Sequence, residues 1–180
     1  MSKSVIEGIG SIYGGVYDEV RIEGIGKLKG DLKTASLNIE GVFKSKARIE
    51  ADTINCEGVA RLLADVKAKT LNIEGVVKIR YGKLEADNII CDGVLISSKE
   101  ISADKLFVDG LCSINKFFGE EIVIKHNSNS MNKTNLPVSI KPFDKLYLGR
   151  TLSSSHSLVD KIECSRLEAS SLQAKIVKAH

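Results

Sequence analysis

The chain of 180 residues has no tryptophan and only two prolines, and aromatic residues make up 5% of it. No apolar stretch approaches the roughly 18 residues needed to span a membrane. The four cysteines lack the CxxC or Cys/His spacing of metal ligands, so they are interpreted as small buried side chains in a reducing cytosol. With 26 basic and 23 acidic residues, the net charge of +3 does not by itself indicate nucleic-acid binding.

What the sequence does contain is a short motif, apolar–acidic–Gly–apolar, which recurs along two thirds of the chain. The motif begins at Ile6, Ile22, Ile39, Cys56, Ile73, Cys91 and Val108. Its glycines follow one another at intervals of 16, 17, 17, 17, 18 and 17 residues. A fixed period of this length is typical of a solenoid, in which each repeat stacks on the next.

Within each repeat, apolar and polar residues alternate, as in Leu71-Asn72-Ile73-Glu74. Alternation with a period of two indicates a β-strand. The glycine that follows is expected to adopt a conformation open to few other residues and to mark a corner. The sequence therefore predicts an all-β fold, a single-stranded β-helix (β-solenoid) of about 17 residues per coil, whose coils lie roughly 4.8 Å apart. Its inward ladders are expected to hold Ile, Val, Leu, Ala, Cys56 and Cys91.

The regularity of the pattern divides the chain into three parts. Residues 1–126 are expected to form the regular β-solenoid, and 127–143, rich in Asn and Ser and containing both prolines, an inserted loop. Residues 144–180 are expected to form less regular C-terminal coils. In this last part Arg166-Leu167-Glu168-Ala169 resembles Arg48-Ile49-Glu50-Ala51, which predicts that the two segments occupy equivalent positions in their coils.

A coil of about seventeen residues carrying [IVC]-[ED]-G-[IVL] resembles the bactofilin family, the polymer-forming cytoskeletal proteins of bacteria. The resemblance is good over residues 5–125 and loose elsewhere. It implies a right-handed, triangular β-helix, although the residues alone do not fix the handedness. It also implies non-polar filaments that assemble end to end without nucleotide and scaffold cell shape, motility structures or wall-modifying machinery.

The resemblance also implies partners and a location. The partners are further copies of the chain, a paralogue, and envelope or motility proteins, and the location is the cytoplasm, at the inner face of the membrane through those partners. Members often have disordered Pro-rich tails and a short apolar N-terminal segment that binds membranes. This chain has a short lead before its first repeat and an internal insertion, so direct membrane binding is not expected.

Polymerisation also follows from the residues themselves. The terminal coils of a solenoid expose unpaired backbone groups and apolar core, and most solenoids cover these ends with a cap. Here the first motif begins at Ile6 and the apolar pattern continues nearly to the last residue, so the simplest partner is another copy. The predicted polymerisation interface consists of Ile6, Ile9 and Ile12 at one end and Leu172, Ile176 and Val177 at the other.

Charged residues are expected to form two outward ladders. The acidic ladder consists of Glu7, Glu23, Glu40, Glu57, Glu74, Asp92 and Asp109, and the basic ladder of Lys27, Lys44, Arg61 and Lys78. They are interpreted as a solvated face that keeps the rod soluble, with lateral bundling or partner docking as the alternative. An outward stack of Asn38, Asn55 and Asn72 is expected to stabilise the solenoid.

No catalytic residue, cofactor or metal site is predicted. The histidines are His126, His156 and His180, and the chain lacks the hexapeptide repeats of the left-handed β-helix acyltransferases that use a histidine. No phosphate-binding loop or Ser/His/Asp arrangement is present. The expected function is a self-polymerising scaffold and not an enzyme. The alternative is a non-polymerising β-solenoid adaptor that binds a protein partner.

Overall fold

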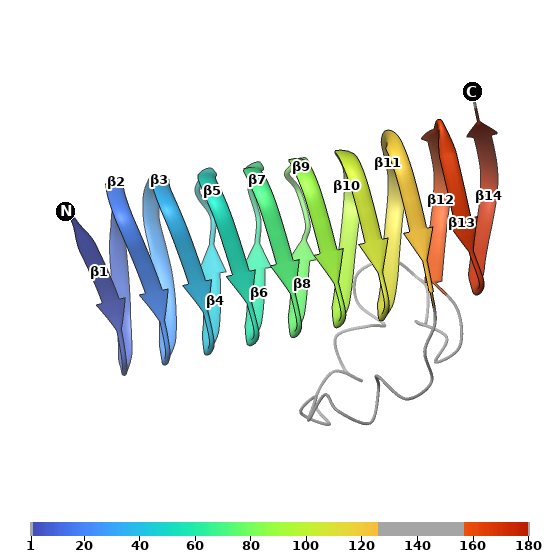
Figure 1. Cartoon of the computed structure of the whole chain (residues 1–180). Coiled ribbons are helices and arrows are strands. Elements are labelled where there is room, and N and C mark those ends of the chain that lie inside the picture. Colours follow the sequence, from blue (N-terminus) through green and yellow to red (C-terminus); the bar gives the residue numbers. More distant parts are fainter. Residues whose placement is uncertain (1, 126–156, 180) are drawn as a thin grey trace.

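The computed structural model describes residues 2–125 and 157–179, and in these ranges the secondary structure consists of parallel β-strands wound into a rod (Figure 1). The strands are β1 (Lys3–Ile6), β2 (Ile9–Ile22), β3 (Ile25–Ile39), β4 (Val42–Ser45), β5 (Ile49–Cys56), β6 (Val59–Leu62), β7 (Val66–Ile73), β8 (Val76–Ile79), β9 (Leu84–Cys91), β10 (Val94–Val108), β11 (Leu111–Ile124), β12 (Ser157–Cys164), β13 (Arg166–Ala169) and β14 (Leu172–Ala179). The predicted all-β solenoid is confirmed.

Each coil has three sides, as the coil that starts at Val59 illustrates. Face 1 is Val59–Leu62, which is β6, and the sheet pairing of β7 is interrupted at Lys69. Face 2 is therefore the first part of β7, residues 66–68, and face 3 is the second part, residues 70–73. Equivalent residues of successive coils pair in register, so each position of the coil forms a ladder along the rod.

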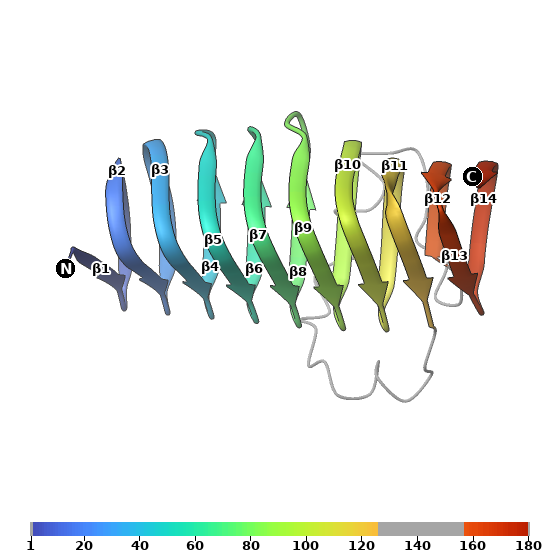
Figure 2. The same cartoon turned by 45° about the horizontal axis from the view of Figure 1, so that its top comes forward.

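The coil is right-handed, in agreement with what the family resemblance implies. In Figure 1 the nearer strands run downwards and the fainter, more distant strands upwards, while the chain advances from the N-terminal to the C-terminal end. Figure 2 shows the same advance from another angle, with the coils stacked side by side along one axis. Within residues 2–125 the paired registers place equivalent residues 16 to 18 positions apart, as in Ile9–Ile25, Ile25–Val42 and Val76–Val94.

The acid–Gly pair forms the corner between face 3 and face 1, as predicted, but for a different reason. In the described residues only Gly15 and Gly30 have positive φ, so the corner glycines need no special backbone conformation. What they need is space, because a Cβ on Gly58 would lie 2.0 Å from the carbonyl oxygen of Gly41 in the preceding coil. The close approach lets the backbone N–H groups of Glu57 and Gly58 both donate to the carbonyl of Ile39, at 2.9 Å each.

The core consists of the inward side chains of all three faces, mostly aliphatic residues. Two of the polar exceptions, Ser45 and Ser97, stand in a ladder of otherwise aliphatic residues, and both are fully buried. The Ser45 hydroxyl donates to the carbonyl of Ala47 at 2.7 Å and accepts from the Ala47 N–H at 3.0 Å. A buried hydroxyl that is bonded in this way stabilises the corner instead of costing the free energy of an unsatisfied polar group.

The C-terminal strands continue the same rod. β12 pairs with β11, and β14 pairs with β12. The predicted equivalence of Arg166–Ala169 with Arg48–Ala51 is wrong, because β13 lies on face 3, paired with residues 121–124, and not on face 2. A match of four residues reproduces the alternation of a strand, but it does not determine on which face of the coil that strand lies. The predicted loop 127–143 and the first part of the expected C-terminal coils, residues 144–156, lie outside the described residues.

All four cysteines are buried and free, and the expectation that Cys56 and Cys91 belong to the core is confirmed. Burial raises the pKa of Cys112 to about 11 and that of Cys56 to about 12. Since the thiolate is the reactive species, we expect these thiols to react with Ellman's reagent at pH 8 far more slowly in the native protein than in denaturant. Fast labelling of Cys56 or Cys112 in the native protein would contradict their placement in a dry core.

Candidate functional site

The two ends of the rod are the first candidate surface, because strand pairing stops there. At the N-terminal end, β1 pairs only with β2, and the parts of β2 on faces 1 and 2 pair only with β3. At the C-terminal end, β13 pairs only with β11 and β14 only with β12. Within residues 2–125 and 157–179 no helix or further strand covers either end, so both present backbone groups available for pairing.

At the N-terminal end the three predicted interface residues differ in position. Ile6 and Ile12 point into the core and are 8% and 3% exposed, so the subunit itself already buries them. The side chain of Tyr17 packs against the core at this end, and its hydroxyl donates to the carbonyl of Tyr13 at 3.1 Å. Ile9 points outward from face 1 and is 85% exposed, which places it on the side of the rod and not on its end.

At the C-terminal end the core is more open. Val177 ends the inward ladder of Phe117 and Ile162, both of which are fully buried, yet Val177 itself is 47% exposed because no coil follows it in the described residues. Leu172 is half-buried and packs against the same core. Ile176 alternates with Val177 and points outward. Of the three predicted residues, Val177 and Leu172 therefore belong to the end surface.

The predicted acidic ladder lies along the corner before face 1. Glu7, Glu57, Glu74 and Asp92 are exposed and Asp109 is half-buried. Glu23 and Glu40 both form ion pairs with Arg21 of face 3, at 2.9 and 2.6 Å, so these two carboxylates are drawn towards that face. The corner is thus a ladder of like charges that is partly neutralised from one side.

The predicted basic ladder lies on face 1. Lys27 and Lys44 are exposed, and Arg61 and Lys78 are half-buried. They pair in register from β3 through β4 and β6 to β8, so they form one line of cations along the rod. The predicted Asn stack is present on face 3, where the Nδ2 of Asn55 donates to Asn38 and that of Asn72 donates to Asn55, each at 2.8 Å.

An outward apolar ladder, which was not predicted from the sequence, runs beside the basic one. It consists of the last residues of the seven motifs: Ile9, Ile25, Val42, Val59, Val76, Val94 and Leu111. The exposed fraction falls from 85% at Ile9 to 43% at Val42 and 7% at Val76. Val76, Val94, Ile96 and Leu111 form a second buried cluster, separate from the core. Counting the strand alternation from each buried corner residue would have shown that these side chains point outward.

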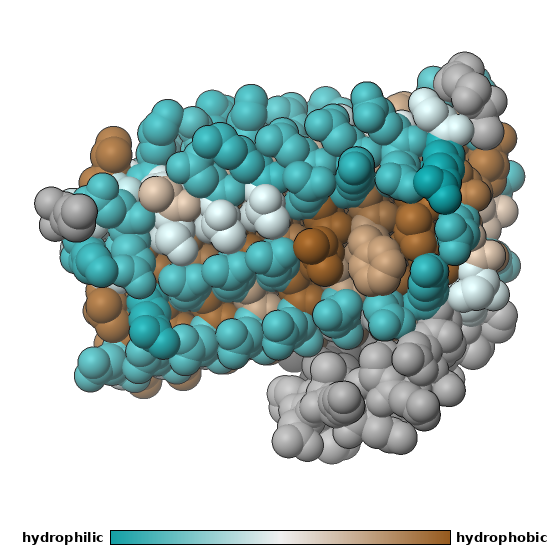
Figure 3. Space-filling model, viewed as in Figure 1, coloured by the Kyte–Doolittle hydropathy of each residue, from teal (hydrophilic) through white to brown (hydrophobic). Residues whose placement is uncertain are grey.

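A second apolar surface lies on face 3, where the Asn stack ends. The ladder continues from Asn72 through Ile90 and Phe107 to Val123. Ile90 is 43% exposed, and Phe107 and Val123 are half-buried. Figure 3 shows this change from hydrophilic to hydrophobic colour towards the C-terminal half of the visible face.

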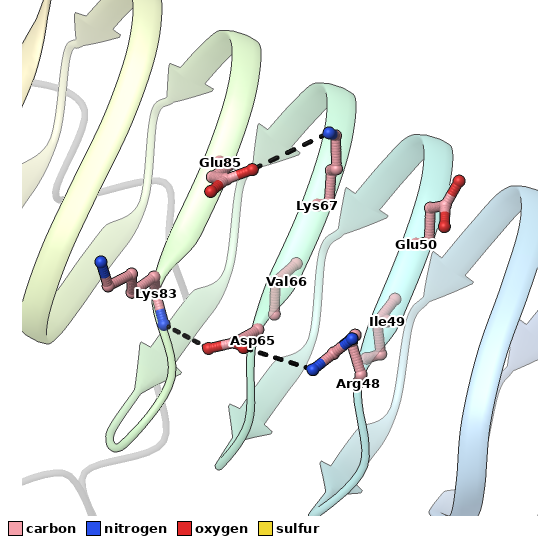
Figure 4. Close-up of a pocket in the computed structure, with 8 residues that line it drawn as sticks. All are labelled: Arg48, Ile49, Glu50, Asp65, Val66, Lys67, Lys83 and Glu85. Carbon is pink, nitrogen blue, oxygen red and sulfur yellow. Dashed lines mark hydrogen bonds and ion pairs between the residues drawn. The ribbon is translucent and has the colours of Figure 1, made fainter.

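Face 2 carries mainly paired charges. A shallow depression over this face and its corner, shown in Figure 4, is lined by charged side chains of three successive coils. Lys67 pairs with Glu85 at 3.8 Å, Arg48 with Asp65 at 3.9 Å, and the backbone N–H of Lys83 donates to Asp65 at 3.0 Å. Each cation faces an acid of a neighbouring coil, which is the arrangement of a structural ladder rather than of a catalytic group.

In the described ranges, no group of three or more His, Cys, Asp or Glu side chains is arranged to hold a metal ion. The histidines His126, His156 and His180 lie outside these ranges. No helix of the described residues is long and apolar enough to cross a membrane. Comparison of the chain with protein-family models, curated proteins and solved structures found no match.

Proposed function

We propose that this protein polymerises end to end into filaments without nucleotide, and that these filaments serve as a passive scaffold for cell shape, motility or envelope processes. The observation that carries the proposal is that, among residues 2–125 and 157–179, no further strand pairs with the outer strands at either end, and that a core residue at the C-terminal end, Val177, is half-exposed. A further coil from another copy would extend every ladder and bury Val177 as Phe117 and Ile162 are buried. The gain per subunit is both apolar burial and backbone hydrogen bonding.

Gly8 gives independent support at the other end. The corner glycines at 24, 41, 58, 75, 93 and 110 each face the preceding coil, whose backbone leaves a Cβ only 2.0 to 2.1 Å of space. Gly8 occupies the same corner of the first coil, where a Cβ would meet nothing within 4 Å. The fold of the single subunit therefore does not require glycine at this position, whereas a coil stacked against it in the same register would.

The first test is negative-stain electron microscopy of the purified protein, without nucleotide and at moderate salt. We expect thin filaments of uniform width whose length increases with protein concentration. Dispersed particles of a single size at high concentration would contradict the proposal.

The alternative function is a non-polymerising adaptor, and the surface that favours it is the apolar patch of Ile90, Phe107 and Val123 on face 3. Exposed apolar patches on the side of a rod are candidate sites for a protein partner. An adaptor would remain a small, discrete oligomer in solution, and substitution of Ile90 would abolish partner binding without changing that oligomer. Sedimentation velocity over a range of protein concentrations separates the two functions.

A further inference from the structure

Face 1 of the first three coils combines lysines with exposed apolar side chains and contains no acid. The segments concerned are residues 9–13, 25–29 and 42–46, and together they hold Lys27, Lys29, Lys44 and Lys46. All four lysines are exposed. Lys27 and Lys44 lie next to Ile25 and Val42 in adjacent outward ladders, so a line of cations runs parallel to a line of aliphatic groups.

These lysines differ from those on face 2, which are paired. Lys33 binds Glu50 at 2.7 Å and Lys67 binds Glu85 at 3.8 Å, and the Lys33 ammonium holds the pKa of Glu50 below its ordinary value. Among the residues that the structure describes, none of the four lysines of face 1 has a carboxylate within ion-pair distance. In the acidic ladder at the corner, Glu23 and Glu40 form their ion pairs with Arg21 on face 3 and not with the lysines of face 1.

The apolar half of the surface is equally exposed to water. Ile9, Ile25 and Val42 are 85%, 45% and 43% exposed, and they form one continuous ladder. Tyr13, at the N-terminal edge of the same face, is 67% exposed, and Lys29 lies 5.6 Å from the centre of its ring. Aliphatic groups beside lysines, with a tyrosine at the margin, match the boundary between anionic headgroups and acyl chains.

We propose that face 1 of these three coils docks on the surface of a bilayer that contains anionic lipids. The apolar ladder enters the headgroup boundary and the lysines bind lipid phosphates. The second and third of these coils repeat the same two kinds of side chain, lysine and an exposed aliphatic group, so the surface suits a fluid partner that has no register of its own. A second copy of the same face would instead bring lysine against lysine.

The test is flotation of the full-length protein with vesicles made of equal parts phosphatidylglycerol and phosphatidylcholine. The proposal does not depend on polymerisation, so the experiment is done in the background of an end-blocking substitution, Val177→Lys, as well as in the unmodified protein. We expect binding to these vesicles, weaker binding as salt is raised, and none to pure phosphatidylcholine. Each lysine near an anionic surface strengthens binding about fivefold, so K27Q/K44Q should weaken it about 30-fold.

Two controls decide whether face 1 is responsible. K33Q/K67Q removes the same charge from face 2 and should leave binding within about twofold, because those lysines are paired with acids. Ile25→Ser should weaken binding, whereas Ile90→Ser, at a side chain of nearly equal exposure on face 3, should not. Circular dichroism checks that each variant keeps the β-fold. Failure to float with anionic vesicles, or equal loss in the two lysine pairs, would overturn the proposal. So would an effect of K27Q/K44Q confined to lateral association of copies in the absence of lipid.

Discussion

Val177→Lys is expected to abolish filaments while leaving the subunit folded. Val177 is half-exposed in the single subunit, where a lysine can reach water past the end of the rod. In a filament the next coil would cover this position and leave an unpaired charge in an apolar core, at a cost of several kcal/mol. A cost of about 3 kcal/mol raises the critical concentration more than 100-fold. Electron microscopy and sedimentation across a concentration series measure the change.

Ile176→Lys is the matched control, because Ile176 is adjacent in sequence and similarly exposed but points out of the side of the rod. It should leave filaments intact. Loss of filaments in both variants would indicate a general effect of charge at the C-terminus, and survival of filaments in Val177→Lys would remove this end from the interface. The oligomeric state of the Val177→Lys variant indicates whether the filament is polar or non-polar. Head-to-tail filaments would fall to monomers, and non-polar filaments to dimers joined at their N-terminal ends.

The sequence predicted the repeat, the corners and most of the core, because the strand alternation and the corner glycine recur at nearly the same interval in every coil. Alternation fixes which residues share a side of the strand. Within face 1 alone it does not say which side is buried where both sides are apolar, as in Val76-Val77, and only a count carried across the corner from Ile73 does. For this reason the outward ladder that starts at Ile9 was not separated from the core. Ile9 was therefore assigned to the end of the rod, although it lies on its side.

The end surfaces were less predictable than the coils. Ile6 and Ile12 were expected at an exposed end, but each is nearly buried, because a side chain at the first coil is still covered by its own coil and by the second. Tyr17, which packs over this end, stands in a ladder whose other members are small or polar, such as Thr34 and Ala51. The large side chain of Tyr17 departs from the repeat, and this departure was the feature of the sequence that could have predicted its packing over the N-terminal end. An arginine at Ile6 would consequently disturb the fold as well as the interface.

Gly58→Ala is expected to destabilise the subunit severely. The added Cβ would lie 2.0 Å from the carbonyl oxygen of Gly41 and 2.5 Å from that of Glu40, both backbone atoms, and the Gly41 carbonyl is held by a hydrogen bond from the Val59 N–H at 2.9 Å. The two coils would have to separate locally, which breaks the paired bonds to the carbonyl of Ile39 and opens the core beneath. We expect a loss of about 3 kcal/mol or more, or roughly 10 °C in Tm for a chain of this size. Thermal and urea unfolding followed by circular dichroism measure it.

Gly8→Ala makes the same chemical change at the equivalent corner of the first coil, where nothing lies within 4 Å of the new methyl group. Its Tm as a dispersed subunit should stay within a few degrees of the unmodified protein. If another copy stacks on this corner as one coil stacks on the next within the chain, the same methyl group would meet that copy's backbone, and filaments would be lost. The pair of variants therefore separates stacking within the subunit from stacking between subunits. Normal filaments from Gly8→Ala would mean that the N-terminal end meets its neighbour in another register. An equal loss of stability in both variants would contradict the packing reason given for the corner glycines.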